Sequence, residues 1–434
     1  MVIAIVPMVI AIMVIAAASL LLRLFNIASI KTFIFDEVYY VDGARDLLAY
    51  GVEVDGSAAE FVVHPPVGKW MIASGIKLFG DNPLGWRIAT AVAGSLMILL
   101  IAAIVHRLFY SSFLTIIASV LMAVDGLALV HSRTALLDNF LALFTLIATY
   151  FFIRKSYYWS GLFLGLAIGT KWSGLYFLAL FGVITLYRAF TFFDGKNLIK
   201  QSLRVITAFG FIPVATYLAS WSGWFLSDRG WKRDSSGNPF IALKNYHEEI
   251  LGFHRNLSTP HNYEANPWSW LIQGRPTSFF YETPSGCGAD SCSQEVLALG
   301  TPLLWWSATI ALAVVIGLWI RSIALRRVDP VATIIITGMA AGYLPWFFFQ
   351  DRTVFGFYSI IFQPFMVLAL VYCAQLFLSH QRRKSERSYQ LGEIGIIALV
   401  AIIAINFIYF LPLYTGELIA YQDWLNRMWF PSWI

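Results

Sequence analysis

Charged residues are scarce in this chain of 434 residues. Asp, Glu, Lys and Arg together make up only 13% of it, whereas soluble globular proteins carry about 25%. Hydrophobic residues reach 59%, so the composition excludes an ordinary soluble domain and predicts an integral membrane protein. The net charge of +5 is small for this length and does not suggest a nucleic-acid partner.

Cysteine is scarce as well, with three residues in all. This number excludes a scaffold held together by disulfides. Cys287 and Cys292 lie in one polar loop and can pair if that loop faces an oxidising space, whereas Cys373 lies in an apolar run. The sequence leaves the redox state of the first two open.

Apolar runs of about 17 to 25 residues fit a hydrocarbon core about 30 Å thick. Eleven are predicted to span the membrane: 6–25, 85–108, 113–131, 136–153, 157–170, 172–189, 204–222, 302–320, 331–349, 355–378 and 392–412. The first lacks a charged leading region and a cleavage site, so we expect a retained helix and not a signal peptide. Without repeats or low-complexity tracts, 1–434 is expected to form a single polytopic membrane domain.

Basic residues indicate the orientation of these spans. With the N-terminus inside, the inner loops hold most dense basic clusters, as the positive-inside rule requires. These clusters are Arg107; Arg154 and Lys155; Arg188, Lys196, Lys200 and Arg204; Arg321, Arg326 and Arg327; and Arg382, Arg383, Lys384 and Arg387. The first outer loop, 26–84, and the large outer loop, 223–301, then lie on the opposite side. Trp-rich pieces of the large loop and the tail 421–434 suit a membrane interface, the tail as a helix.

Two adjacent acids, Asp36 and Glu37, follow the first hydrophobic segment. The residues after them have helical spacing and predict a helix along the outer membrane surface. Acids at such a position can simply cap the helix. The alternative is that they take part in chemistry at the membrane surface.

Further unusual charges lie on the predicted outer side. His64 and Lys69 flank a stiff Pro-Pro segment that can hold them near the acids. A second set lies at the outer ends of spans, where a charge is costly and usually paired or functional; it comprises Arg133, Asp138, Lys171 and Arg352. Arg133 and Asp138 can form a structural ion pair. Three separate cations facing two acids would suit an anionic lipid headgroup and a site for proton abstraction.

Six segments of this sequence resemble protein O-mannosyltransferases. They are FDEVYY, HPPVGKW, HSRTALLDN, GTKWSGLY, HNYEANPWSWLIQGRP and PWFFFQDRTVFGFY, which occur in this order over nearly the whole length. The resemblance implies an all-α GT-C glycosyltransferase fold with about 11 transmembrane helices and outer amphipathic surface helices. It implies transfer of mannose from polyprenyl-phosphate-mannose to Ser or Thr hydroxyls of exported proteins.

The large outer loop has no room for the β-trefoil MIR insert of the eukaryotic relatives. The match is therefore closer to bacterial, especially actinobacterial, members, which act at the plasma membrane with the catalytic side extracytoplasmic. The expected partners are the polyprenyl-linked donor, exported acceptor proteins and the bilayer, with the protein export machinery as a further candidate. Without the insert, acceptor recognition is left to the loop itself.

The family's inverting transfer requires a general base for the acceptor hydroxyl. We predict Asp36 in this role, with Glu37 as the second choice or as a partner that orients acceptor and base. Arg133, Arg352 and Lys171 are predicted to bind the donor phosphate. The predicted substrate-binding residues are His64, Lys69, Asp138, His261 and Arg275, the last two from the large outer loop. No cofactor is expected; a divalent cation is the alternative for stabilising the leaving group.

Two other functions share some of these features. A GT-C transferase that uses another polyprenyl-linked sugar, or a lipid or glycan acceptor, would need the same acid and cations. A transporter would be expected to carry charges and broken helices near the bilayer centre. The unusual charges of this chain gather instead at one surface, which argues against transport.

Overall fold

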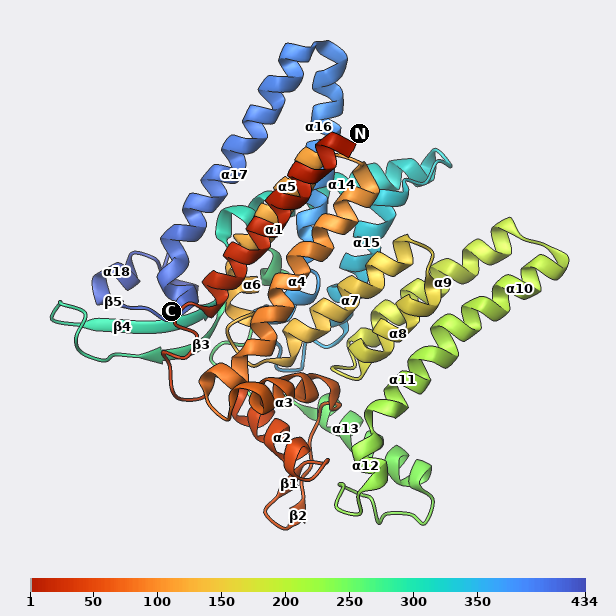
Figure 1. Ribbon diagram of the computed structural model, residues 1–434, viewed down its shortest axis with the longest axis vertical. Helices are drawn as coiled ribbons and strands as arrows, with labels where there is room; N and C mark the ends of the chain where they lie inside the picture. Colours follow the sequence, from red (N-terminus) through yellow and green to blue (C-terminus); the bar gives the residue numbers. More distant parts are fainter. Residues whose placement is uncertain (1) are drawn as a thin grey trace.

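The computed structural model describes the backbone of residues 2–434 and the side chains of residues 6–434. Long helices form a bundle, with shorter helices and strands at one end (Figure 1). The helices at the predicted spans are α1 (Val2–Leu24), α4 (Pro83–Phe109), α5 (Ser112–Ala123), α6 (Gly126–His131), α7 (Leu137–Ile153), α8 (Tyr157–Ile168), α9 (Gly174–Phe192), α10 (Gly195–Ile206), the π-helix η1 (Thr207–Phe211), α11 (Ile212–Ser220), α14 (Pro302–Ala324), α15 (Pro330–Gly342), the 3-10 helices η3 (Leu344–Phe348) and η4 (Gly356–Ile361), α16 (Gln363–Lys384) and α17 (Glu386–Thr415).

Within the described residues, eight helical segments are long and apolar enough to cross a membrane. The three others, α5, α7 and α8, are apolar but have only 12, 17 and 12 residues. A helix of 12 residues rises about 18 Å, less than the roughly 30 Å of a hydrocarbon core. The prediction of a helical, multi-pass membrane protein is confirmed, and the count of eleven crossings stays a prediction.

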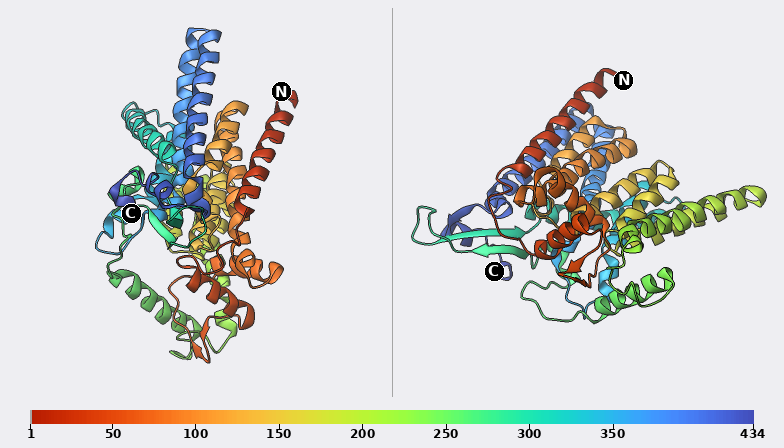
Figure 2. Two further views of the ribbon diagram at one scale, coloured as in Figure 1. Left: turned by 90° about the vertical axis from the view of Figure 1, so that its left-hand side faces the viewer. Right: turned by 60° about the horizontal axis from the view of Figure 1, so that its bottom comes forward.

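The bundle has a buried centre and a lipid-facing periphery. Helices α4 and α16 are largely buried inside the protein, whereas α1 and α9 expose most of their apolar surface. Such exposed apolar faces are expected where lipid is the solvent. Figure 2 shows α16 and α17 running side by side beyond the rest of the bundle, in agreement with their mutual contacts.

Most of the first predicted outer loop and the first half of the second lie at one end of the bundle, at the bottom of Figure 1, whereas residues 277–298 of the second extend to its left. The first contains α2 (Glu37–Ala49), β1 (Val54–Asp55), β2 (Ala58–Ala59) and α3 (Val67–Phe79). The second contains α12 (Ser222–Leu226), α13 (Pro239–Asn256) and the 3-10 helix η2 (Pro267–Ile272). Helix α3 starts directly after the Pro-Pro pair, with Pro66 at its N-cap position, because the ring of proline fits the first turn of a helix but not its interior.

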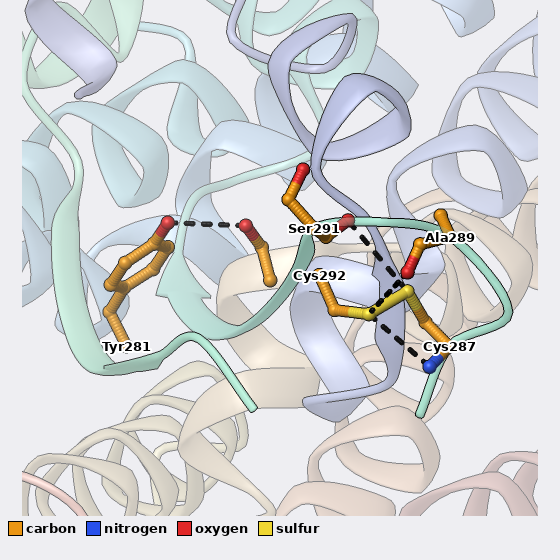
Figure 3. Close-up of a disulfide and its surroundings, with 6 residues drawn as sticks. Tyr281, Cys287, Ala289, Ser291 and Cys292 are labelled. Atoms are coloured by element: carbon orange, nitrogen blue, oxygen red, sulfur yellow. Dashed lines mark hydrogen bonds between the residues drawn. A yellow bond between two sulfur atoms is a disulfide. The ribbon is translucent and has the colours of Figure 1, made fainter. Parts of the chain in front are cut away.

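The second loop also contributes to a three-stranded antiparallel sheet in the order β3 (Thr277–Glu282), β4 (Cys292–Ala298), β5 (Leu418–Ala420). A disulfide between Cys287 and Cys292 closes the β3–β4 turn (Figure 3), which answers the question that the sequence left open. Beside it, the Tyr281 hydroxyl and the Ser293 hydroxyl are hydrogen-bonded at 3.1 Å. The sheet is absent from the sequence-based prediction of an all-α chain.

The prediction of an interfacial helix over 421–434 is wrong for most of that segment. Only α18 (Tyr421–Leu425) is α-helical, followed by the short 3-10 helix η5 (Pro431–Trp433). Trp424 and Trp433 are buried, and their indole N–H groups donate to the Glu295 carboxylate and the Gln273 carbonyl. The tryptophans therefore anchor the tail to the protein, since a buried indole N–H needs an acceptor.

Candidate active site

Asp36 stands at the N-cap position of α2, but its side chain makes no capping hydrogen bond. The alternative that both acids serve only as caps therefore fails for Asp36. Asp36 is half-buried, and in the described chain its one side-chain hydrogen-bond partner is the Tyr40 hydroxyl, which donates to it at 3.4 Å. Burial raises the pKa of Asp36 to about 6; the positive charge of Lys171 opposes this shift, and the negative charge of Asp138 adds to it. A carboxylate with this pKa and free acceptor capacity suits a general base.

Glu37, one residue further on, is fully buried and fully engaged. Both of its oxygens accept hydrogen bonds from Arg87, each at 2.8 Å. The backbone N–H groups of Ile34 and Ala135 also donate to it, each at 2.8 Å. Arg87 in turn donates to three backbone carbonyls of the α1–α2 segment, those of Ile27, Ile30 and Thr32. The Glu37–Arg87 pair therefore holds the loop that carries Asp36, and leaves Glu37 no free acceptor for a substrate.

Asp138 and Lys171 form a buried ion pair of 2.7 Å. Asp138 lies in the first turn of α7, where the helix dipole favours a negative charge. Asp138 therefore pairs with Lys171, and the predicted alternative of an ion pair with Arg133 is wrong. The Lys171 ammonium also lies 5.4 Å from the centre of the Tyr358 ring.

Lys171 occupies a tight junction between α8 and α9. Its N–H donates to the Ala167 carbonyl at 3.0 Å, and its own carbonyl accepts from Gly174 at 3.1 Å. The Gly169 carbonyl accepts from Val67 at the start of α3, at 2.9 Å. Backbone hydrogen bonds thus fix the position of Lys171 relative to α3.

Two histidines and an arginine lie next to this pair. The rings of His64 and His254 are 5.4 Å apart, and the ring nitrogen Nε2 of His254 lies 3.0 Å from the Val63 carbonyl. A neutral His254 with its proton on Nε2 donates there and can accept from Arg352 through Nδ1, at 3.4 Å. Burial and the charge of Arg352 lower the pKa of His254 to about 4, and burial lowers that of His64. Both histidines are therefore neutral at neutral pH.

A cavity of about 330 Å³ opens among these residues. Its polar lining includes His64, Asp138, Lys171, His254, Arg255 and Arg352. Three cations and one acid make this lining positive, and the buried Nε of Arg352 has no hydrogen-bond partner in the described chain. Such a cavity can bind an anion, because an arginine presents several donors in a fixed geometry.

A second cavity, of about 430 Å³, continues from the first along the bundle. The two share Trp172, Leu175 and Leu251. Its remaining lining is mostly apolar and comes mainly from α9 and α11, with Leu178, Pro213 and Val214 among the residues; Ile168 of α8 and His247 of α13 complete it. A polar cavity therefore leads into an apolar groove between two peripheral helices.

Four predicted site residues lie elsewhere. Arg133 donates to the carbonyls of Leu22, Arg23 and Phe25 at the end of α1, and to that of Thr415. Lys69 forms a buried ion pair with Glu53 and donates to the His64 carbonyl.

Arg275 donates to the carbonyls of Asn262, Ser432 and Ile434, and so ties the large loop to the tail. His261 is exposed, and its ring lies 6.3 Å from that of Phe35, the residue before Asp36. Of these four side chains, only that of His261 is open to a substrate near Asp36.

Among the cavity residues that sequence reasoning missed are His254, Arg255 and Tyr358. Tyr358 ends one of the six segments that resemble the family, so the segment itself was the available signal. His254 and Arg255 end the amphipathic helix α13 and stand in none of those segments. Nothing in their local pattern distinguishes them from a helix with a basic last turn.

Comparisons with known proteins extend over nearly the whole chain. A family model described as "Dolichyl-phosphate-mannose-protein mannosyltransferase" matches residues 63–221. A second, described as "C-terminal four TMM region of protein-O-mannosyltransferase", matches residues 240–433.

Individual proteins give the same result. The polyprenol-phosphate-mannose–protein mannosyltransferase of Mycolicibacterium smegmatis is 33% identical, with 97% of this chain and 92% of that protein covered. The protein of the same name from Corynebacterium glutamicum is 30% identical, with coverage of 92% and 88%. A structure of the S. cerevisiae protein O-mannosyltransferase Pmt1-Pmt2 complex bound to the sugar donor has a TM-score of 0.84 at 15% identity, covering 99% of this chain and 93% of that chain.

Proposed function

This chain belongs to the protein O-mannosyltransferase family, and from that premise we propose that it transfers mannose from polyprenyl-phosphate-mannose to Ser or Thr hydroxyls of exported proteins. Its helices have the predicted GT-C glycosyltransferase fold. The observation that carries the proposal for the site is the pairing of a free carboxylate, Asp36, with a cationic cavity that continues into an apolar groove.

Asp36 is the general base of the proposed reaction. Its carboxylate takes the proton of the acceptor hydroxyl while the hydroxyl oxygen bonds to C1 of mannose. The bond between C1 and the phosphate oxygen breaks on the opposite face, and the phosphate leaves with the electron pair. With a pKa of about 6, most Asp36 side chains are ionised at neutral pH and still hold the proton better than an ordinary carboxylate would.

Arg352 and Lys171 stabilise the phosphate that leaves. Arg352 and Lys171 line one cavity, so positive charge is in place before the charge on the phosphate develops. Asp138 fixes the position of Lys171 and neutralises part of its charge. The polyprenyl chain lies in the apolar groove between α9 and α11.

The acceptor approaches from the side of the large outer loop. His261 is exposed there, and its ring contacts the rings of Phe35 and Phe355. We assign this end of the bundle to the extracytoplasmic face of the plasma membrane, with the N-terminus in the cytoplasm. The basic hairpin turns at the opposite end support the assignment, and an outward-facing site suits acceptors delivered by the protein export machinery.

Labelled polyprenyl-phosphate-mannose and a Ser/Thr-rich peptide, incubated with membranes that contain the protein, test this function. We expect labelled peptide, and a loss of about 10²–10⁴-fold for Asp36→Asn. Asp42→Asn is the matched control, because Asp42 lies on the same helix and pairs with Arg45 at 2.6 Å. Label in a lipid or glycan, with none in the peptide, would favour the alternative of a transferase with a lipid or glycan acceptor. Full activity of Asp36→Asn would refute the assignment of Asp36 as the general base.

A further inference from the structure

A third cavity, of about 690 Å³, lies at the end of the bundle opposite the candidate active site. It is formed where the α4–α5, α7–α8 and α9–α10 connections approach the start of α15. Its volume falls in the range of sites for small molecules, about 300–1,000 Å³. The proposed transfer takes place at the other end and does not use this cavity.

The charge of the lining is entirely positive. Arg107, Lys155, Arg188 and Arg204 line the cavity, and no Asp or Glu does. In the described chain none of the four forms an ion pair. The nearby Asp329 is engaged elsewhere, as the N-cap of α15 and the acceptor of a hydrogen bond from Tyr372. Four cations without counter-charges around one cavity predict an anionic ligand.

The contacts of these cations orient them but do not neutralise them. Arg204 donates to the Lys155 carbonyl at 2.9 Å, and its guanidinium lies 5.0 Å from the centre of the Tyr157 ring. Arg107 donates to the Tyr110 hydroxyl at 2.7 Å. All of these partners are neutral, so the positive charge remains available to a ligand.

The backbone at the cavity is unusual at two positions. Tyr110 and Lys155 both have positive φ, 52° and 58°, at the ends of α4 and α7. Glycine is the least strained residue in that conformation, and strained positions cluster at functional sites. In addition, the π-helix η1 begins two residues after the lining residue Val205, and π-turns are frequent at functional sites.

Most of the remaining lining is apolar, apart from Thr185, Gln201 and two tyrosines, and it reaches the lipid-facing surface. Leu108, Phe152, Phe192, Phe193 and Ile334 belong to it, and Phe192 is 73% exposed. A ligand that combines an anionic group with hydrocarbon chains matches both parts of the cavity, whereas a soluble anion would leave the apolar part unfilled.

We propose that this cavity binds the headgroup of an anionic phospholipid from the leaflet opposite the candidate active site. The phosphodiester lies among the four cations, and the acyl chains run along the phenylalanines of α9. Basic pockets between transmembrane helices on the cytoplasmic side are known to suit such headgroups. The site is separate from the proposed donor site, because the two cavities share no lining residue, and α7 and α9 line them with opposite ends.

Binding can be measured on delipidated protein in neutral detergent by native mass spectrometry, with phosphatidylglycerol, phosphatidylcholine or sodium phosphate as the probe. We expect phosphatidylglycerol to be retained and phosphatidylcholine not. In Arg188→Gln/Arg204→Gln the affinity for phosphatidylglycerol should fall at least about tenfold, at roughly 1 kcal/mol per cation. Arg383→Gln/Arg387→Gln removes the same charge from exposed positions at the same end and should bind as the unaltered protein does.

The unfolding temperature without lipid shows whether the variants fold. If the double variant does not fold, Arg107→Gln serves instead, since in the described chain the Arg107 side chain hydrogen-bonds only to the exposed Tyr110. The affinity of this variant should fall about fivefold. Equal retention of phosphatidylglycerol by the cavity variant and the control would overturn the proposal. Displacement of phosphatidylglycerol by millimolar sodium phosphate alone would also overturn it, in favour of a site for free anions.

Discussion

Two groups of charges lie at the same end of the bundle and differ in how far the protein itself occupies their hydrogen-bonding positions. We call the fully occupied group closed and the other group open. In the closed group, the Glu37 carboxylate and the guanidinium of Arg87 are surrounded by hydrogen-bond partners within the protein. In the open group, Asp36 has one weak side-chain partner, and Arg352 keeps a buried nitrogen without any.

Asp36 and Glu37 are adjacent in sequence and yet belong to different groups. The type of residue and its distance from the membrane therefore do not determine the roles of these two acids. What distinguishes them is the number of donors and acceptors that the fold leaves free. A closed charge stabilises structure, whereas an open one can serve a substrate.

The largest expected effect is on the stability of the closed group. Glu37→Gln leaves Arg87 buried with an uncompensated charge, and should lower the free energy of unfolding by about 3–5 kcal/mol. Chemical denaturation in detergent measures this loss. Glu248→Gln is the matched control, because Glu248 forms an exposed ion pair with Lys244 at 2.6 Å, worth at most about 1 kcal/mol. Equal unfolding midpoints for the two variants would contradict the assignment of Glu37 to structure.

For the open group the effect should appear in the rate. Arg352→Gln removes a preorganised cation beside the proposed position of the leaving phosphate, and should lower kcat about 10²–10³-fold while the protein stays folded. Arg133→Gln is the informative counterpart, since the Arg133 guanidinium binds only backbone carbonyls. We expect Arg133→Gln to reduce stability and to leave the rate per folded molecule nearly unchanged. If Arg133→Gln lowered the rate and Arg352→Gln lowered only the stability, Arg133 would belong to the open group and Arg352 to the closed one.

The pH dependence of the rate should reveal the raised pKa of Asp36. Its folded pKa of about 6 lies above the ordinary value of 3.8, so the base becomes protonated as the pH falls through 6. The rate should then decrease about tenfold for each further pH unit, whereas an ordinary carboxylate would sustain the rate down to about pH 4. Asp138→Asn removes a neighbouring negative charge, so it should lower the pKa of Asp36 and shift the fall in rate to lower pH. A rate that stays constant from pH 7 to pH 5 would contradict the prediction.

The smallest expected effect is that of a chelator. If Arg352 and Lys171 supply the positive charge at the phosphate, EDTA should leave the transfer rate unchanged. Assays with EDTA, and with EDTA followed by excess Mg²⁺ or Mn²⁺, measure this. A loss of activity that the metal restores would transfer the stabilising role from the side chains to a divalent cation.

Much of the helical architecture follows from local sequence. An apolar run forms a helix in a membrane whatever lies beside it, so the predicted spans coincide with helices of the structure. The outer ends of those spans also bring Asp138, Lys171 and Arg352 to one cavity, which His64 of the first outer loop lines as well. Because successive spans alternate in direction, residues at their outer ends lie on the same side of the membrane. This follows from the order of the spans alone and does not depend on how the helices pack.

Pairings between distant residues could not be predicted in the same way. Arg87 reads as part of an apolar span, yet it binds an acid 50 positions earlier. The sequence likewise cannot show that Arg133 caps α1 or that Lys69 pairs with Glu53, because both contacts depend on how helices pack. The tail was assigned wrongly for a related reason, since Trp suits a membrane interface and a protein core equally well.

The junction at Lys171 constrains the length of the chain as well as its composition. Hydrogen bonds at Ala167, Lys171 and Trp172 leave no slack between α8 and α9. One inserted residue would break these hydrogen bonds and lengthen the turn, and would carry Lys171 away from Asp138. Natural relatives that keep this site can therefore vary in the identity of many neighbours, but insertions and deletions between α8 and α9 should be rare among them.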